Sequence, residues 1–331
     1  MFDHNKTFII AELSANHNND FDLAVKTIKA MALAGADAVK VQTYTPDSLA
    51  LDLDNDFFGP IKDGLWKGIR RYDLYKQASM PYEWQPKLKK IAEDLGLVFF
   101  SSPFDLEAVD FLESFDCPMY KIASFEITDI PLIEYVASKK KPIIISTGVA
   151  ELEDIKLAVD ACLSKGNNDI TLLKCTSQYP ASIEAANLLT IPDMRQRFNV
   201  KVGVSDHTMG GLVPIVAVSL GAQMVEKHFI LDRNLGGPDS PFSLQPDEFK
   251  QMVTDIRNAE KALGSVNYEV SNSDKNKRRS LFVTQDIAIG DTISIQNVRS
   301  LRPGYGMHPK VLIDYIGTSS TKKYRRGDPF I

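Results

Sequence analysis

Eight short apolar segments, separated by amphipathic stretches, constrain the fold more than any other feature of this 331-residue sequence. Each has the length and the β-branched or aromatic content of a buried strand, and a helical pattern follows each one. Eight such units in about 260 residues are typical of an α/β protein with a closed, parallel (β/α)8 barrel. The predicted strands are residues 8–13, 38–44, 98–104, 119–124, 142–148, 170–176, 201–207 and 224–229.

An open, doubly wound sheet is the alternative fold. Its usual nucleotide-binding motif, G-x-G-x-x-G, does not follow the first predicted strand, so the barrel is favoured. Residues 45–81 form an insertion too long for an ordinary strand-to-helix loop, and we predict that they make a rim or lid.

The sequence changes in texture after the last predicted helix, which ends at Gly264. We predict a barrel domain over residues 1–265, a polar linker over 266–280 and a small β-rich domain over 281–331. Short alternating runs and Gly-Asp turns favour strands in this last part. A domain of this size needs a surface to dock on.

Charge and hydropathy exclude two classes of partner. The net charge is −5 and the charges are interspersed rather than grouped, so no nucleic-acid-binding surface is predicted. No apolar run approaches the roughly 18 residues of a membrane span, and no cationic segment precedes an apolar one at the N-terminus. We therefore expect a cytoplasmic protein that does not bind membranes.

A lysine interrupts one of the most apolar predicted strands, Ala38–Tyr44, and a buried ammonium needs an anionic partner. Lys40 and Lys121 occupy comparable places in their strands, and hydroxyl side chains follow several others. Together they predict a cradle for a small dianionic ligand, and a structural ion pair is the alternative for either lysine alone. Lys174 and Lys227 point to this cradle less strongly, because strand alternation can turn them toward the helices.

His207 and His228 end the last two predicted strands, which a closed barrel places side by side. Two neutral imidazoles with oxygen donors nearby predict a divalent metal site that leaves room for substrate, although a lone strand histidine is more often a core residue. Glu126 follows Lys121 closely, where an acid beside a bound anion is unfavourable unless it handles a proton or a water molecule.

These motifs also carry a resemblance. IIAELSANH, AVKVQTYT, FSSPF, YKIAS, KCTSQYP, SDH and EKHF, followed by SLRPGYG, occur in order from about Phe8 to the C-terminus. In this the sequence resembles the sialic acid synthase family, whose members condense phosphoenolpyruvate with an amino-sugar aldehyde to make nine-carbon 2-keto acids. The segments QTYTPDSL and GGPDSPFSL are most similar to the branch that uses 2,4-diacetamido-2,4,6-trideoxy-L-altrose for flagellin or surface glycans. A neuraminic or legionaminic acid synthase is the alternative.

The resemblance implies roles for the site residues. Lys40, Ser102 and Lys121 would hold the phosphoenolpyruvate, Ser124, Ser177 and Ser205 would add phosphate contacts, and His207 and His228 would bind Mn²⁺ or Mg²⁺. Glu126 would assist the water that attacks C2, and Glu12, Gln42, Tyr179 and Asp239 would face the sugar. Related neuraminate synthases carry asparagine where this chain has Ser177.

The resemblance also implies an antifreeze-like (SAF) domain at the C-terminus and a domain-swapped homodimer, in which Arg302 reaches an acetamido group of the partner's substrate. Two rival functions remain at this point. One is an aldolase that uses Lys40 or Lys121 as a Schiff-base nucleophile. The other is a binding module in which the C-terminal domain recognises its target and the barrel is a scaffold.

Overall fold

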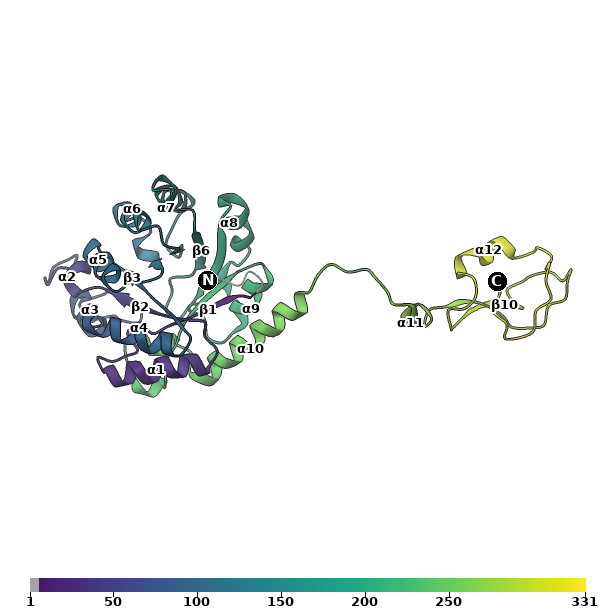
Figure 1. The fold of residues 1–331 in the computed structure, drawn as a ribbon, viewed down its shortest axis with the longest axis horizontal. Coiled ribbons are helices and arrows are strands. Elements are labelled where there is room, and N and C mark those ends of the chain that lie inside the picture. The colour runs from purple at the N-terminus through teal and green to yellow at the C-terminus, as the bar shows by residue number, and fades with distance from the viewer. Residues whose placement is uncertain (1–5) are drawn as a thin grey trace. The chain divides into compact units, whose positions relative to one another are not determined.

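The computed structural model describes residues 6–331 and divides the chain at Gly264 into two compact units. Residues 1–5, part of the N-terminal stretch in which no targeting segment is predicted, lie outside the described range. The first unit contains all eight strands of a closed barrel, and the second unit contains a two-stranded sheet. Figure 1 shows the barrel strands enclosed by helices.

The predicted barrel is confirmed. All neighbouring strands pair in parallel, and β8 pairs with β1 to close the ring. Every observed strand falls within a predicted one, because a strand covered on both faces reads as a continuous apolar run. The strands are β1 (Phe8–Glu12), β2 (Ala38–Thr43), β3 (Val98–Pro103), β4 (Tyr120–Ile122), β5 (Ile143–Ser146), β6 (Ile170–Cys175), β7 (Lys201–Asp206) and β8 (Met224–His228).

Three of the outer helices begin directly after an aspartate that caps them. The side chains of Asp20, Asp105 and Asp129 each accept a hydrogen bond from a main-chain N–H in the first turn of the helix that follows. The outer helices are α1 (Phe21–Leu33), α4 (Gln85–Asp94), α5 (Leu106–Ser114), α6 (Ile130–Ser138), α7 (Leu152–Ser164), α8 (Thr190–Phe198), α9 (Leu212–Ser219) and α10 (Pro246–Leu263).

The insertion after β2 has structure of its own. It contains the helices α2 (Pro46–Leu49) and α3 (Arg71–Ala78), and between them a narrow loop in which Pro60 and Arg70 form an antiparallel bridge. The main-chain N–H of Ile61 donates to the Ile69 carbonyl, and the N–H of Gly68 donates to the Ile61 carbonyl, which holds this loop. As predicted, the segment lies at the rim of the barrel, where it lines the cavity described below.

The second unit is built on the antiparallel pair β9 (Ser280–Val283) and β10 (Val298–Leu301), with the short helices α11 (Asn272–Lys275) and α12 (Leu312–Tyr315). Further isolated bridges tie its turns together. Its small core contains Leu281, Val283, Ile287, Ile293, Val298 and Phe330. Its assignment as an antifreeze-like domain stays a prediction.

Membrane insertion finds no support in the helices. Over residues 6–331, none combines the length and the apolar character that a membrane crossing requires.

Candidate active site

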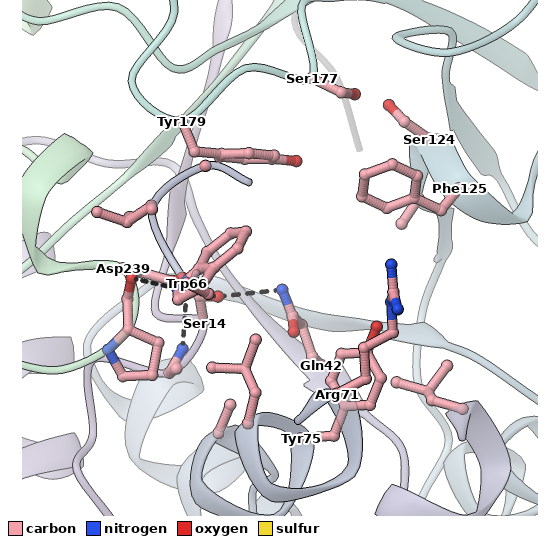
Figure 2. A pocket seen from close by; sticks show the side chains of 18 of the residues that line it. Ser14, Gln42, Trp66, Arg71, Tyr75, Ser124, Phe125, Ser177, Tyr179 and Asp239 are labelled. Carbon is pink, nitrogen blue, oxygen red and sulfur yellow. Dashed lines mark hydrogen bonds between the residues drawn. The ribbon is translucent and has the colours of Figure 1, made fainter. Parts of the chain in front are cut away.

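A cavity of about 770 Å³ opens at the carboxyl ends of the barrel strands. Its walls come from the ends of β1, β2, β4, β6 and β8, from the insertion after β2, and from residues 238–242 (Figure 2). In a parallel barrel this is the end where side chains from many strands converge, so the fold itself collects the polar groups here. Seven predicted site residues line the cavity: Gln42, Ser124, Glu126, Ser177, Tyr179, His228 and Asp239.

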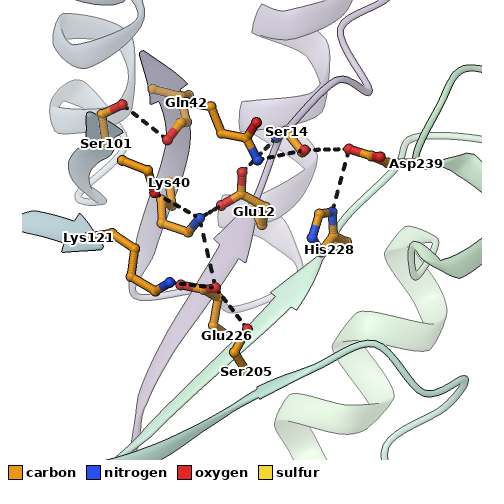
Figure 3. Close-up of polar contacts among 12 residues, drawn as sticks. Glu12, Ser14, Lys40, Gln42, Ser101, Lys121, Ser205, Glu226, His228 and Asp239 are labelled. Atoms are coloured by element: carbon orange, nitrogen blue, oxygen red, sulfur yellow. Dashed lines mark hydrogen bonds and ion pairs between the residues drawn. The ribbon is translucent and has the colours of Figure 1, made fainter. Parts of the chain in front are cut away.

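Two lysines and two glutamates form a buried cluster inside the barrel. Lys40 pairs with Glu12, and Glu226 lies 3.8 Å from Lys40 and 3.7 Å from Lys121 (Figure 3). The strand register produces this arrangement, because Glu12 is the partner of Lys40 across β1 and β2. The lysine in the apolar strand therefore has two carboxylates as counterions, which burial of an ammonium requires.

The same burial shifts the protonation equilibria of this cluster. It raises the pKa of Glu12 to about 7, although the Lys40 ammonium opposes the rise. Burial also acts to raise the pKa of Glu226, but Lys121 and Lys40 outweigh it and the net shift is downward. Burial lowers the pKa of Lys121. A bound anion would therefore lie beside two ammonium groups whose counterions are Glu12 and Glu226. Of these two carboxylates, Glu12 can take up a proton near neutral pH.

Serine hydroxyls surround Gly148 after β5. The main-chain N–H of Gly148 donates to Ser124 Oγ at 3.1 Å. A Cβ added at Gly148 would come within 2.8 Å of Ser124 Oγ and closer still to Ser177 Oγ, so glycine is what lets the two hydroxyls converge. Each hydroxyl has a proton that it can donate to a phosphate or carboxylate.

The two other predicted serines lie beside the lysines. Ser102 Oγ lies 3.5 Å from Lys40 Nζ, and Ser205 donates to Glu226 Oε1 at 2.9 Å. Ser205 is thus engaged with a carboxylate, and a phosphate contact would require its hydroxyl to change partner.

His207 and His228 lie together, with their ring centroids 5.2 Å apart. His207 Nδ1 lies 3.0 Å from the carbonyl oxygen of Thr176, which can only accept, so Nδ1 carries a proton, and Nε2 keeps its lone pair when the ring is neutral. Burial acts to lower the pKa of His207, but the neighbouring Cys175 side chain and the Thr176 carbonyl outweigh it, and the net shift is upward. Burial, with His207 adding to it, holds the pKa of His228 well below its ordinary value. Its buried Nδ1 has no hydrogen-bond partner over residues 6–331, and it lies 3.9 Å from Asp239 Oδ2 (Figure 3).

These two imidazoles fit a divalent cation, since each can present a lone pair and one of them is a buried, unsatisfied nitrogen. Within the described range, no group of three or more His, Cys, Asp or Glu side chains is arranged to hold a metal ion. His207 and His228 would be protein ligands of the cation, with water or substrate at open positions.

Glu126 lies in a short 3-10 helix after β4, Ser124–Glu126, and lines the cavity. Burial raises its pKa to about 7, with Lys121 acting in the opposite direction. Its Oε2 atom is buried and has no hydrogen-bond partner in the described part of the chain. A carboxyl that is half ionised near neutral pH and faces a cavity can exchange a proton with a bound water or substrate.

Comparison with known proteins decides the family. The NeuB family model matches residues 27–268. The chain belongs to the NeuB family. It is 46% identical over 326 residues to a pseudaminic acid synthase of Campylobacter jejuni, covering 98% of this chain and 95% of that protein. It is 38% identical to an N,N'-diacetyllegionaminic acid synthase of Legionella pneumophila, covering 94% and 89%.

A solved structure agrees with this membership. The N-acetylneuraminic acid synthetase of Leptospira borgpetersenii, crystallised with citrate, has 32% sequence identity and a TM-score of 0.73, covering 82% of this chain and 90% of that one. The family resemblance read from the motifs is therefore confirmed.

The other seven predicted members of the site are not among the residues that line the cavity of this NeuB-family chain: Glu12, Lys40, Ser102, Lys121, Ser205, His207 and Arg302. Glu12 pairs with Lys40, and its expected contact with the sugar stays a prediction. Arg302 directly follows β10 and so belongs to the second unit, and its contact with a substrate stays a prediction. Lys227 and Lys174, for which the sequence indicated a role in the cradle less strongly, bind other groups. Lys227 Nζ donates to Asp206 at 2.5 Å, and Lys174 Nζ donates to the Cys175 carbonyl at 2.8 Å.

The sequence analysis assigned no role to several residues of this NeuB-family site. Glu226 is the clearest case, and strand alternation could have found it, since Glu226 and His228 are two apart and share a face of β8. Trp66 and Arg71 line the cavity from the insertion. No pattern in the sequence distinguishes them from rim residues.

Proposed function

We propose that this chain is a pseudaminic acid synthase, which condenses phosphoenolpyruvate with 2,4-diacetamido-2,4,6-trideoxy-L-altrose to give pseudaminic acid and phosphate. The observation that carries the proposal is the 46% identity to a pseudaminic acid synthase over nearly the whole of both chains. The identity to a legionaminic acid synthase is lower, so the acceptor sugar of that enzyme is the second candidate. Both share the same phosphoenolpyruvate chemistry.

Phosphoenolpyruvate is bound by Lys40, Lys121 and the serine hydroxyls. The two ammonium groups take its carboxylate and phosphate charges, and Ser102 contributes beside Lys40. Ser124 and Ser177 form the phosphate cradle around Gly148, and Ser205 joins it by releasing Glu226. Fixed donors of this kind orient the enol with its C3 toward the acceptor.

The acceptor sugar lies in the outer cavity against Gln42, Tyr179 and Asp239. His207 and His228 would hold Mn²⁺ or Mg²⁺, which when bound polarises the aldehyde carbonyl. Tyr179 packs on His207 with ring centroids 4.5 Å apart and so lies beside the imidazole pair.

The bond changes then follow from the positions of these groups. C3 of the enol forms a carbon–carbon bond with the aldehyde carbon, the π bond of the carbonyl breaks and its oxygen takes up a proton to become a hydroxyl, and positive charge develops at C2. Water adds to C2 while its proton passes to the Glu126 carboxylate. The tetrahedral centre collapses to the 2-keto acid with cleavage of the C2–O bond, and phosphate leaves within the serine cradle.

Phosphate release from phosphoenolpyruvate, measured with a panel of amino sugars and with the product identified by mass, tests the proposal. We expect turnover with the 2,4-diacetamido-L-altrose derivative in preference to N-acetylmannosamine. Borohydride trapping with pyruvate tests the aldolase, since a covalent adduct on Lys40 or Lys121 would favour a Schiff base.

The wider setting of the proposal follows from the family. We propose a domain-swapped homodimer, in which Arg302 of the antifreeze-like domain reaches an acetamido group bound to the other barrel, and a cytoplasmic enzyme that supplies sugars for flagellin or surface glycans. Sedimentation of the full chain tests the dimer.

A further inference from the structure

Ser14 lies directly beyond β1 in a conformation that serine seldom adopts. Its φ is 46°, in the left-handed region, and it is 5% exposed. A residue other than glycine in this region costs free energy, and contacts elsewhere must hold it there. The main-chain N–H of Ser14 donates to Glu12 Oε1 at 3.1 Å. Its hydroxyl contacts two side chains from distant parts of the chain, Gln42 and Asp239 (Figures 2 and 3).

The direction of each hydrogen bond follows from the number of protons available. The main-chain N–H of Ala15 donates to Asp239 Oδ2 at 3.3 Å, so this oxygen is an acceptor. The Ser14 hydroxyl therefore donates its single proton to the same oxygen. Having no other proton, Ser14 Oγ accepts from Gln42 Nε2 at 3.1 Å.

This chain of bonds fixes which polar atoms remain for a ligand. The Gln42 carboxamide turns its NH₂ group to Ser14 and keeps its carbonyl oxygen free of hydrogen bonds to any residue in 6–331. The Oδ1 atom of Asp239 is likewise unbonded in that range. Both residues line the cavity beside Ser14. This part of the wall therefore presents two acceptors, and a ligand must bring two N–H or O–H donors to satisfy them.

We propose that Ser14 is a positioning residue for the acceptor sugar: its hydroxyl orients Gln42 and Asp239 so that both accept from the sugar's hydroxyl or acetamido N–H groups. The inference rests on the proposed function and adds to it that this part of the cavity wall presents hydrogen-bond acceptors to the sugar. Without the Ser14 hydroxyl, the carboxamide can rotate and turn its NH₂ group to the sugar, and donor would then face donor.

Ser14→Gly tests this directly, because glycine adopts a left-handed backbone without strain and removes only the hydroxymethyl group. We expect KM for the acceptor to rise about tenfold, as for the loss of one to two hydrogen bonds, with KM for phosphoenolpyruvate within about twofold of wild type. The thermal midpoint should not fall. Asp116→Gly, at another left-handed position (φ 56°) in the loop before β4, is the matched control and should leave both KM values unchanged.

A double-mutant cycle separates positioning from independent binding. If Ser14 acts through Gln42 and Asp239, then Ser14→Gly combined with Gln42→Ala should lose less acceptor kcat/KM than the product of the two single losses, and Ser14→Gly should cause no further loss once Asp239→Ala is also present. The proposal would be overturned by losses of acceptor kcat/KM that multiply in the combined variant. An unchanged acceptor KM in Ser14→Gly, or equal rises in the two KM values, would also overturn it.

A spectroscopic measurement tests the role of Ser14 independently of the proposed function. The Gln42 side-chain amide ¹⁵N–¹H signals, identified by their absence in Gln42→Ala, should show slow hydrogen exchange in the wild type and fast exchange in Ser14→Gly. If the wild type turned over no amino sugar, the proposed function would fail. Equal exchange in the two proteins would instead refute the role of Ser14.

Discussion

Replacing Glu126 by glutamine should make the barrel more stable above neutral pH while stopping turnover. Burial raises the pKa of Glu126 from the ordinary 4.5 to about 7. At about 1.4 kcal/mol per pKa unit, keeping this carboxylate ionised in the folded state costs about 3 kcal/mol. Glutamine has the same shape and never ionises, so the variant does not pay this cost.

The pH dependence follows from where the proton is bound. Between pH 4.5 and 7 the folded wild type holds a proton that the unfolded chain has released, so its stability falls over this window and then levels off. The free energy of unfolding of Glu126→Gln should therefore match the wild type near pH 4.5. It should exceed the wild type by up to about 3 kcal/mol at pH 8.

Urea unfolding followed by tryptophan fluorescence is the assay, because both tryptophans, Trp66 and Trp84, lie in the barrel unit. Glu107→Gln, which removes an exposed carboxylate on α5, controls for the loss of one charge. Isotope-labelled phosphoenolpyruvate should still bind the Glu126→Gln protein. An identical stability difference at pH 5 and pH 8 would refute the reasoning, and equal loss of binding and turnover would mean that Glu126 is structural.

Three further predictions concern the metal, the cradle and the second unit. His207→Ala and His228→Ala should each abolish an activity that EDTA also removes and Mn²⁺ restores, and full activity in EDTA would count against the metal. Gly148→Ala should raise KM for phosphoenolpyruvate at least tenfold, because the added Cβ crowds two serine hydroxyls; an unchanged KM would show that the phosphate binds elsewhere. Ending the chain at Gly264 should weaken use of the sugar more than binding of phosphoenolpyruvate, and an unchanged sugar KM would remove the role of Arg302.

The barrel could be predicted from the sequence because each of its strands is covered on both faces. Such strands become uninterrupted apolar runs, and the eight runs with their following helices leave few other folds. The predicted bounds differ most from the observed ones where few residues pair. The strand predicted over residues 119–124 is β4, which spans only Tyr120–Ile122, because a 3-10 helix begins at Ser124. The polar residues at strand ends were equally readable, since topology alone carries them to one mouth.

The interior of the site needed the tertiary structure. The sequence demanded a counterion for Lys40 without naming it, and the strand register supplies Glu12 and Glu226. Ser14 and Asp239 are 225 positions apart and bond through a left-handed turn that no local pattern announces. Sequence by itself determined which segments are buried and which polar groups reach the mouth, because hydrophobic periodicity and parallel topology are properties of the chain. Only the tertiary structure decided which side chains neutralise, orient or crowd one another. The energies of these interactions depend on distances between residues that are far apart in the chain.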